Sequence, residues 1–185
     1  LVIPKYKYVL DNQLKNKDTM KTKYRNNGAV GALLDEYEKS ITELKNVILN
    51  LTTSELTNIV DNETKDEDCK SIQTILSHIV ESGYTYVIEI RKSLSENVNY
   101  ISKDILSSTQ EYAIALDKMF AYNEKLFEDY PNIQLEEYDP NKKFEVRWGQ
   151  KYDVEQLYEH AIVHILRHRR QIEKIKLANK KAKTC

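Results

Sequence analysis

The sequence predicts an all-α protein that folds as an antiparallel four-helix bundle, preceded by an irregular N-terminal arm. Apolar residues recur at steps of three and four along four segments of similar length, which is the period of an amphipathic helix. Only four glycines and three prolines occur among 185 residues, about a third of average usage, so turn-rich β-sandwiches are disfavoured. No alternating segments flank an Asn-Gly or Asp-Gly turn, and we therefore expect no β-strand.

The length predicts one domain, because domains typically contain about 100 to 200 residues. With 41% apolar residues the chain can bury a sizeable core. Residues 1–28 are polar, rich in Lys and Asn, and contain Pro4, so we expect them to form the arm. The bundle is expected to span residues 29–180, and residues 181–185 to form a polar tail.

The first helix is expected to begin at Ala29 and to end in the region 51–60. Its apolar stripe consists of Val30, Leu33, Leu34, Tyr37, Ile41, Leu44, Ile48 and Leu51. The acidic segment 61–69 has no periodicity and is predicted to be a loop. Asp68 or Ser71 is then expected to cap a second helix. The stripe of that helix consists of Ile72, Ile75, Leu76, Ile79, Tyr86, Val87, Ile90 and Leu94.

Gly83 interrupts the second stripe, which indicates that a neighbouring element packs closely there. Segment 96–104 breaks the pattern before a third stripe, formed by Leu106, Ala113, Leu116, Phe120, Phe127 and Tyr130, and Pro131 ends that helix. Segment 131–151 is the longest irregular stretch, and Asp153 is expected to cap the last helix. The stripe of the last helix consists of Val154, Leu157, Tyr158, Ala161, Ile165, Ile172 and Ile175. Four such helices are best packed as an antiparallel bundle.

The four histidines indicate a metal site. His160, His164 and His168 lie four residues apart on the last predicted helix, so their side chains form a row on one face. Neighbours in this row are about 6 Å apart along the axis and can share an ion, whereas the outer two are about 12 Å apart. A third ligand must therefore come from another helix, where the only other histidine is His78. No glutamate follows His164, so the segment is not the HExxH motif of a metallopeptidase.

Two segments resemble the DinB-like (YfiT-like) family of metal-dependent proteins. They are SIQTILSHIVESGYTYV at 71–87 and RWGQKYDVEQLYEHAIVHILRHRRQIEKI at 147–175, and the element HxxxHRxQI is the most specific part. The resemblance covers roughly residues 29–176. It implies a four-helix bundle that binds one divalent metal ion, zinc or nickel, through His78, His164 and His168.

The sequence departs from the family pattern next to these ligands. Arg170 stands where the family usually has glycine, and Arg167 precedes His168, so the local charge is more positive than in the family. We expect Arg167 and Gln171 to contact the ligands or to line a substrate pocket. For His160 the alternatives are the same role, a proton carrier near the substrate, or a simply buried side chain. We assign no catalytic residue. Trp148 is expected, with its neighbour Arg147, to plug the end of the bundle rather than to cover the site.

Three neutral imidazoles leave an open position on the ion, which is typical of a catalytic rather than a structural site. The resembled superfamily includes transferases that use low-molecular-weight thiols such as bacillithiol or mycothiol. We therefore expect a metal-dependent transferase with a small-molecule substrate and a metal-activated thiol as cosubstrate. A hydrolase that uses a metal-bound hydroxide is one alternative. A non-catalytic stress or binding protein, with a structural ion and a homodimeric bundle, is another.

Charge and composition narrow the expected partners. The chain has 28 Lys and Arg against 29 Asp and Glu, and no helix-turn-helix element, so we expect no nucleic-acid partner despite the family's association with DNA damage. No run of about 18 apolar residues occurs, so we expect no membrane segment. Two cysteines and the absence of a signal-peptide pattern indicate a cytoplasmic protein.

Overall fold

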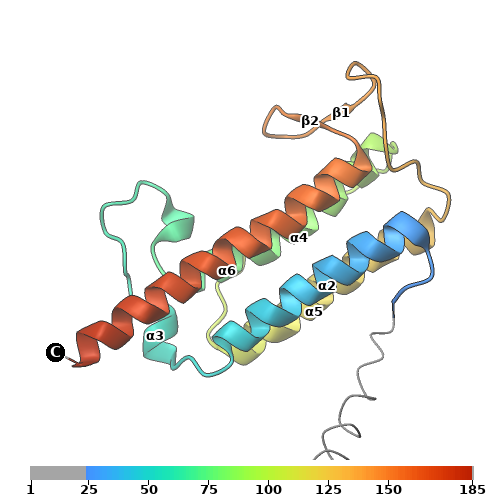
Figure 1. Cartoon of the computed structure of the whole chain (residues 1–185). Helices are drawn as coiled ribbons and strands as arrows, with labels where there is room; N and C mark the ends of the chain where they lie inside the picture. The colour runs from blue at the N-terminus through green and yellow to red at the C-terminus, as the bar shows by residue number, and fades with distance from the viewer. Residues whose placement is uncertain (1–23, 185) are drawn as a thin grey trace, which may run out of the picture.

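The computed structural model describes residues 24–184, with side chains through residue 179. The described chain is mainly helical, which confirms the all-α prediction. Its long helices are α2 (Gly28–Ile48), α4 (Ile72–Ser93), α5 (Thr109–Asp129) and α6 (Val154–Thr184). In Figure 1, α6 lies along α4 and α2 lies along α5, and α2 also packs against α6 and α4 against α5. Among the helices of residues 24–184, none combines the length and apolarity needed to cross a bilayer.

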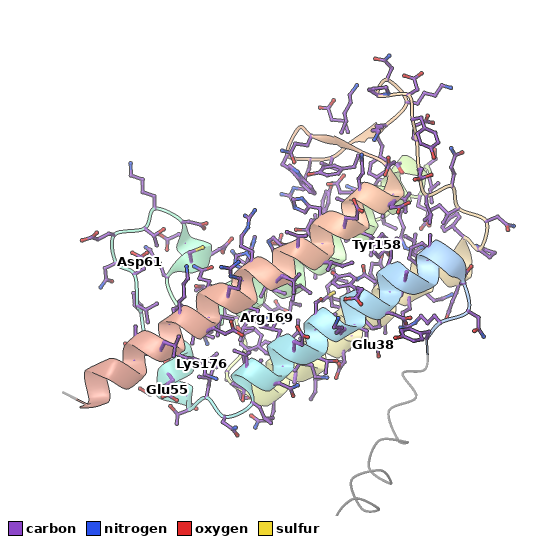
Figure 2. All side chains as sticks on the ribbon, viewed as in Figure 1. Glu38, Glu55, Asp61, Tyr158, Arg169 and Lys176 are labelled. Carbon is purple, nitrogen blue, oxygen red and sulfur yellow. The ribbon has the colours of Figure 1, made fainter. Side chains whose placement is uncertain are left out.

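Most residues of the predicted stripes form one core between the long helices, whereas Leu94, predicted in the second stripe, is exposed at the end of α4. Tyr37 of α2 and Tyr158 of α6 are both almost fully buried, and their rings meet edge to face with centroids 6.3 Å apart. Tyr37 also meets Phe120 of α5 at 5.8 Å, so aromatic rings from three helices join at one point. Figure 2 shows Tyr158 on the side of α6 that faces α2. Arg169, which is also on α6, forms an ion pair with Glu43 on α2.

Serine and threonine caps explain where the helices begin. Ser71 accepts a hydrogen bond from the Thr74 amide at the start of α4, so Ser71 and not Asp68 is the cap. Ser108 does the same for α5. The Asp153 carboxylate accepts from the Gln156 amide at 2.9 Å, which confirms the predicted cap of α6.

The first helix is shorter than the longer predicted limit. It ends at Ile48, and the next turns form a separate helix α3 (Thr53–Thr57). Thr52 and Glu55 form a reciprocal capping box at the start of α3, which favours a new helix over a continuation of α2. A short 3-10 helix η1 (Glu67–Cys69) then lies within the predicted acidic loop.

The expectation of no β-strand is wrong. Strands β1 (Phe144–Glu145) and β2 (Lys151–Tyr152) pair antiparallel within the segment predicted to be irregular. Gly149 adopts φ of +83°, which glycine tolerates readily, and the Val146 amide donates to the Gln150 carbonyl at 2.9 Å. Strands of two residues are too short to produce an alternating sequence pattern, so period-2 analysis could not find them.

The N-terminal and C-terminal limits of the described helices differ slightly from the predicted limits of the bundle. Residues 1–23 of the predicted arm lie outside the described residues, and α2 begins at Gly28. At the other end α6 continues through Thr184, so residues 181–184 of the predicted tail are helical. Lysine and alanine dominate this end and have high helix propensity, which explains the continuation.

Gly83 provides the close approach that the sequence predicted between α4 and a neighbour. A Cβ at this position would lie 2.4 Å from Sδ and 2.8 Å from Cγ of Met119 on α5. Met119 is fully buried, so it has little room to move away. The contact therefore sets the spacing of α4 and α5.

Replacing Gly83 by alanine should destabilise the protein by about 1–3 kcal/mol, because the added methyl group overpacks the Met119 contact. In a Met119→Ala background the same change should be neutral or stabilising by up to about 1 kcal/mol, because alanine is the better helix former. Urea unfolding of the two single variants and the double variant measures this coupling. Equal effects of Gly83→Ala in both backgrounds would show that Met119 does not limit the spacing.

Candidate metal centre

Three histidine side chains converge between α4 and α6. His78 comes from the second turn of α4, and His164 and His168 come from successive turns of α6, which packs against α4. The Nε2 atom of His164 lies 2.9 Å from Nε2 of His78 and 3.2 Å from Nε2 of His168. Among the described residues these three side chains form a group that could hold a metal ion.

The opposite ring nitrogens show which tautomers are present. Nδ1 of His168 lies 3.0 Å from the amide oxygen Oε1 of Gln171, and Nδ1 of His78 lies 3.2 Å from a carboxylate oxygen of Asp68. The Gln171 oxygen can only accept, so Nδ1 of His168 carries the proton and its Nε2 carries a lone pair, and the negative charge of Asp68 favours the same tautomer of His78. The Asp68 oxygen lies off the N–H direction, so this second contact is mainly electrostatic rather than an aligned hydrogen bond.

These lone pairs fit a metal ion. His164 can donate to only one of its two neighbours, so at least one close pair of nitrogens would face each other without a proton between them. Nitrogens that surround a tetrahedral ion at about 2.1 Å lie about 3.4 Å from one another, close to the two observed separations. A cation in this space would therefore replace repulsion by coordination, and the three histidines fit a divalent metal ion.

The surroundings keep the imidazoles in the form that binds metal. Burial, followed by the neighbouring His168 and His78 rings, lowers the pKa of His164 to about 2. Burial also lowers the pKa of His168, although its contact with Gln171 acts in the opposite direction. Neutral imidazole is the ligand form, so His164 and His168 need not lose protons near neutral pH.

Asp68, which the sequence predicts as a candidate helix cap, instead lies behind one of the candidate ligands, His78. It lies in η1, and its second oxygen forms an ion pair with Lys103 from the segment before α5. A carboxylate behind a histidine ligand orients the ring and increases its basicity. Asp68 is ten residues from His78 in the chain, and no local spacing signals the contact, so only the fold shows it.

The predicted neighbour Gln171 does contact a ligand, as described for His168. Its Oε1 also lies 4.0 Å from Sγ of Cys69, and this thiol lies 3.4 Å from an Asp66 carboxylate oxygen. Segment 61–69 thus covers the site from one end, through Asp68 and Cys69. The acidic composition of this segment predicted a loop but not its contacts with the histidines.

His160 is not part of the ligand group. Its Nδ1 lies 3.3 Å from the Tyr152 hydroxyl, and its ring packs against Trp148 and Tyr86 at centroid distances of 6.2 and 5.5 Å. The ring also lies nearly parallel to that of His164, at 6.3 Å. His160 therefore extends the metal centre into a cluster of aromatic side chains, which we call the aromatic wall: Tyr86, Trp148, Tyr152 and His160.

A groove of about 440 Å³ runs along this wall and reaches the metal ligands. Its lining includes His78 and His164, together with Tyr86, Trp148 and Glu81. One side of the histidine group thus faces a space large enough for a small molecule. Figure 1 shows the two segments that frame this region, the 61–69 loop with η1 and the β1–β2 hairpin, rising from the same side of α4 and α6.

The predicted role of Trp148 as a plug of the bundle end is wrong. Its side chain is 39% exposed and lies against His160 and Tyr86 rather than in the core. The prediction assumed that the chain ran straight into α6, whereas the β1–β2 hairpin turns it back beside the helix. Arg147 likewise lies outside the core, with its guanidinium 4.6 Å from the Tyr100 ring centre.

Alanine at His78, His164 or His168 should remove most of the bound metal, because each change deletes one of three converging ligands. His160→Ala is the matched control, since it removes an imidazole from the same helix face without touching the ligand group. Elemental analysis of protein purified without an affinity-column metal measures the stoichiometry. Loss of metal in His160→Ala with retention in His168→Ala would show that the site lies one helical turn earlier on α6.

Asp68→Asn should weaken metal affinity about 10- to 100-fold, because a neutral amide supports the His78 ring less strongly than a carboxylate does. Asp61→Asn in the same loop is the control, because the asparagine oxygen can still accept from the amides of Glu63 and Thr64. Competition with a chelator of known affinity gives the dissociation constants. Equal affinities of the two variants would exclude a supporting role for Asp68.

Comparison of the chain with protein-family models, curated proteins and solved structures found no match. The resemblance of the histidine-bearing segments to the DinB-like family therefore remains a prediction. The chemistry of the site rests on the contacts of its own residues.

Proposed function

We propose that the chain is a metal-dependent enzyme of the DinB-like type, an antiparallel four-helix bundle that binds one zinc or nickel ion through His78, His164 and His168. The observation that carries the proposal is the convergence of three Nε2 atoms, with Asp68 and Gln171 orienting two of the rings from behind. The contacts of α2 and of α4 with both α5 and α6 support the bundle architecture.

An enzyme is favoured over a structural metal site because the ligand group is incomplete and accessible. A structural zinc site closes four protein ligands around the ion, whereas the described residues supply three. His78 and His164 are only partly buried and line the groove, so a fourth position faces the space beside the aromatic wall. A small molecule can reach that position.

The proposed reaction is transfer of a low-molecular-weight thiol to an electrophile. A divalent ion held by three neutral histidines acts as a Lewis acid that promotes deprotonation of a thiol or of water. A thiol, with a pKa of about 8.5, needs much less assistance than water, and it needs no protein base. Asp68 is turned towards His78 and Lys103, and no hydrogen bond within the described residues links Glu81 to a histidine. These contacts favour thiol transfer over hydrolysis.

Zinc-loaded protein should accelerate the reaction of N-acetylcysteine with 1-chloro-2,4-dinitrobenzene, in which a carbon–sulfur bond forms and chloride leaves. Thioether formation is followed by absorbance. His168→Ala should react at the rate of the uncatalysed mixture, whereas the exposed-site control Leu177→Ala should match the wild type. Chelation should abolish the acceleration and restored zinc should return it.

Two results would contradict the proposed reaction. An acceleration that survives removal of the metal would show that the histidine site is not responsible. Metal-dependent hydrolysis of 4-nitrophenyl acetate, unaffected by added thiol and without any thioether product, would instead establish the hydrolase.

A further inference from the structure

A second pocket adjoins the metal centre on the far side of His160. It has a volume of about 370 Å³ and is bounded by α6 and strand β2. His160 and His164 line this pocket as well as the groove, so the two spaces meet at the metal ligands. Lys151 and Tyr152 from β2 and Arg167 from α6 also line it.

The two cations of this pocket have no carboxylate partner. Within the part of the chain that the structure describes, no ion pair joins Arg167 or Lys151 to an acidic side chain. By contrast, Arg25 contacts three carboxylates, and Arg91 and Arg169 contact two each, whereas Arg147 and Arg170, which do not line this pocket, also have no ion pair within the described residues. An arginine that lines a pocket without a partner has its hydrogen-bond donors free for a ligand.

The pocket has a net positive charge. Its one acidic side chain is Glu159, which is eight residues before Arg167 on α6 and so about 12 Å away along the helix axis. Lys151 and Arg167 outnumber it, and a divalent ion on the neighbouring histidines would add to the excess. The Arg167 charge also reaches the site: burial, and then Arg167, lowers the pKa of His160.

We propose that Arg167 and Lys151 form an anion-binding subsite for the carboxylate or phosphate group of the small molecule that reacts at the metal centre. The guanidinium can bind either oxyanion with two parallel hydrogen bonds, and Lys151 supplies a second charge from the hairpin. Tyr152 and His160 line the same pocket and can contact an unsaturated part of the ligand. This inference rests on the proposed function, because it names the substrate class of the same site.

Phenyl phosphate is the probe, because it joins an oxyanion to a planar ring. Trp148 is the only tryptophan of the chain, and its ring centroid lies 6.2 Å from that of His160, so its fluorescence reports binding at the wall. Arg167→Gln should raise the dissociation constant of zinc-loaded protein by roughly tenfold or more, as expected for loss of a charge-assisted contact. Arg170→Gln removes an equal charge from the same helix outside the pocket and should leave it unchanged within about twofold. Benzyl alcohol, which has no charge, should not compete.

The same titration distinguishes failure of the subsite from failure of the metal site. Metal content and thermal unfolding are measured for each variant, and the titration is repeated on metal-free protein. If the wild type holds no metal, the proposed function fails, but weaker binding by metal-free Arg167→Gln than by metal-free Arg170→Gln still supports the subsite. Equal binding by the two variants in folded protein, or no saturable binding by the wild type at millimolar concentrations, overturns it.

Discussion

The crowding of three imidazole nitrogens between α4 and α6 is the constraint around which this structure is organised. Gln171 accepts the Nδ1 proton of His168 and the Asp68 carboxylate lies near Nδ1 of His78, which favours Nε2 lone pairs close to His164 on both rings. Such an arrangement in a partly buried space is unfavourable without a cation. A metal ion bound by these histidines would link α4 to α6, and part of its binding free energy would become folding free energy.

Two polar segments outside the long helices supply the remaining side chains around the histidine group. Segment 61–69 supplies Asp68 behind His78 and Cys69 beside Gln171, while the β1–β2 hairpin supplies Trp148, Tyr152 and Lys151 on the other side. The helices fix the ligand positions, and the loops determine what else reaches the ion. This division is expected where a rigid scaffold carries the ligands and variable connections provide specificity.

The helices and the ligand triad could be predicted from the sequence because both depend on short-range periodicity. Steps of three and four residues place Tyr37 and Ile41 in the core, and the four-residue step of the histidines aligns them on one face. His78 follows as the only other histidine of the sequence, and the family resemblance selects His164 and His168 as its partners. The close approach at Gly83 is also visible in the sequence, because an isolated glycine in a helix usually has a packing reason.

The parts that could not be predicted depend on contacts between distant segments or on very short elements. Helix-start rules make Asp68 a candidate cap because they consider only the next turn, and its contact with His78 forms only when η1 folds back over α4. The hairpin has two-residue strands and a turn at Gly149 that lacks the usual Asn-Gly signature. Without that hairpin, the sequence places Trp148 at the end of the bundle rather than beside His160.

The same contacts explain why one pair of histidines on α6 and not the other completes the site. His164 belongs to both neighbouring pairs, so the position of His78 along α6 decides between them. The His78 ring lies 4.8 Å from the His164 ring and 5.1 Å from the His168 ring, on the side where Asp68 and Gln171 are placed. On the other side, His160 contacts the Tyr152 hydroxyl and the aromatic wall instead. The position of His78 on α4 therefore selects the ligand pair, and the third imidazole of the row lines the groove and the pocket beside the hairpin.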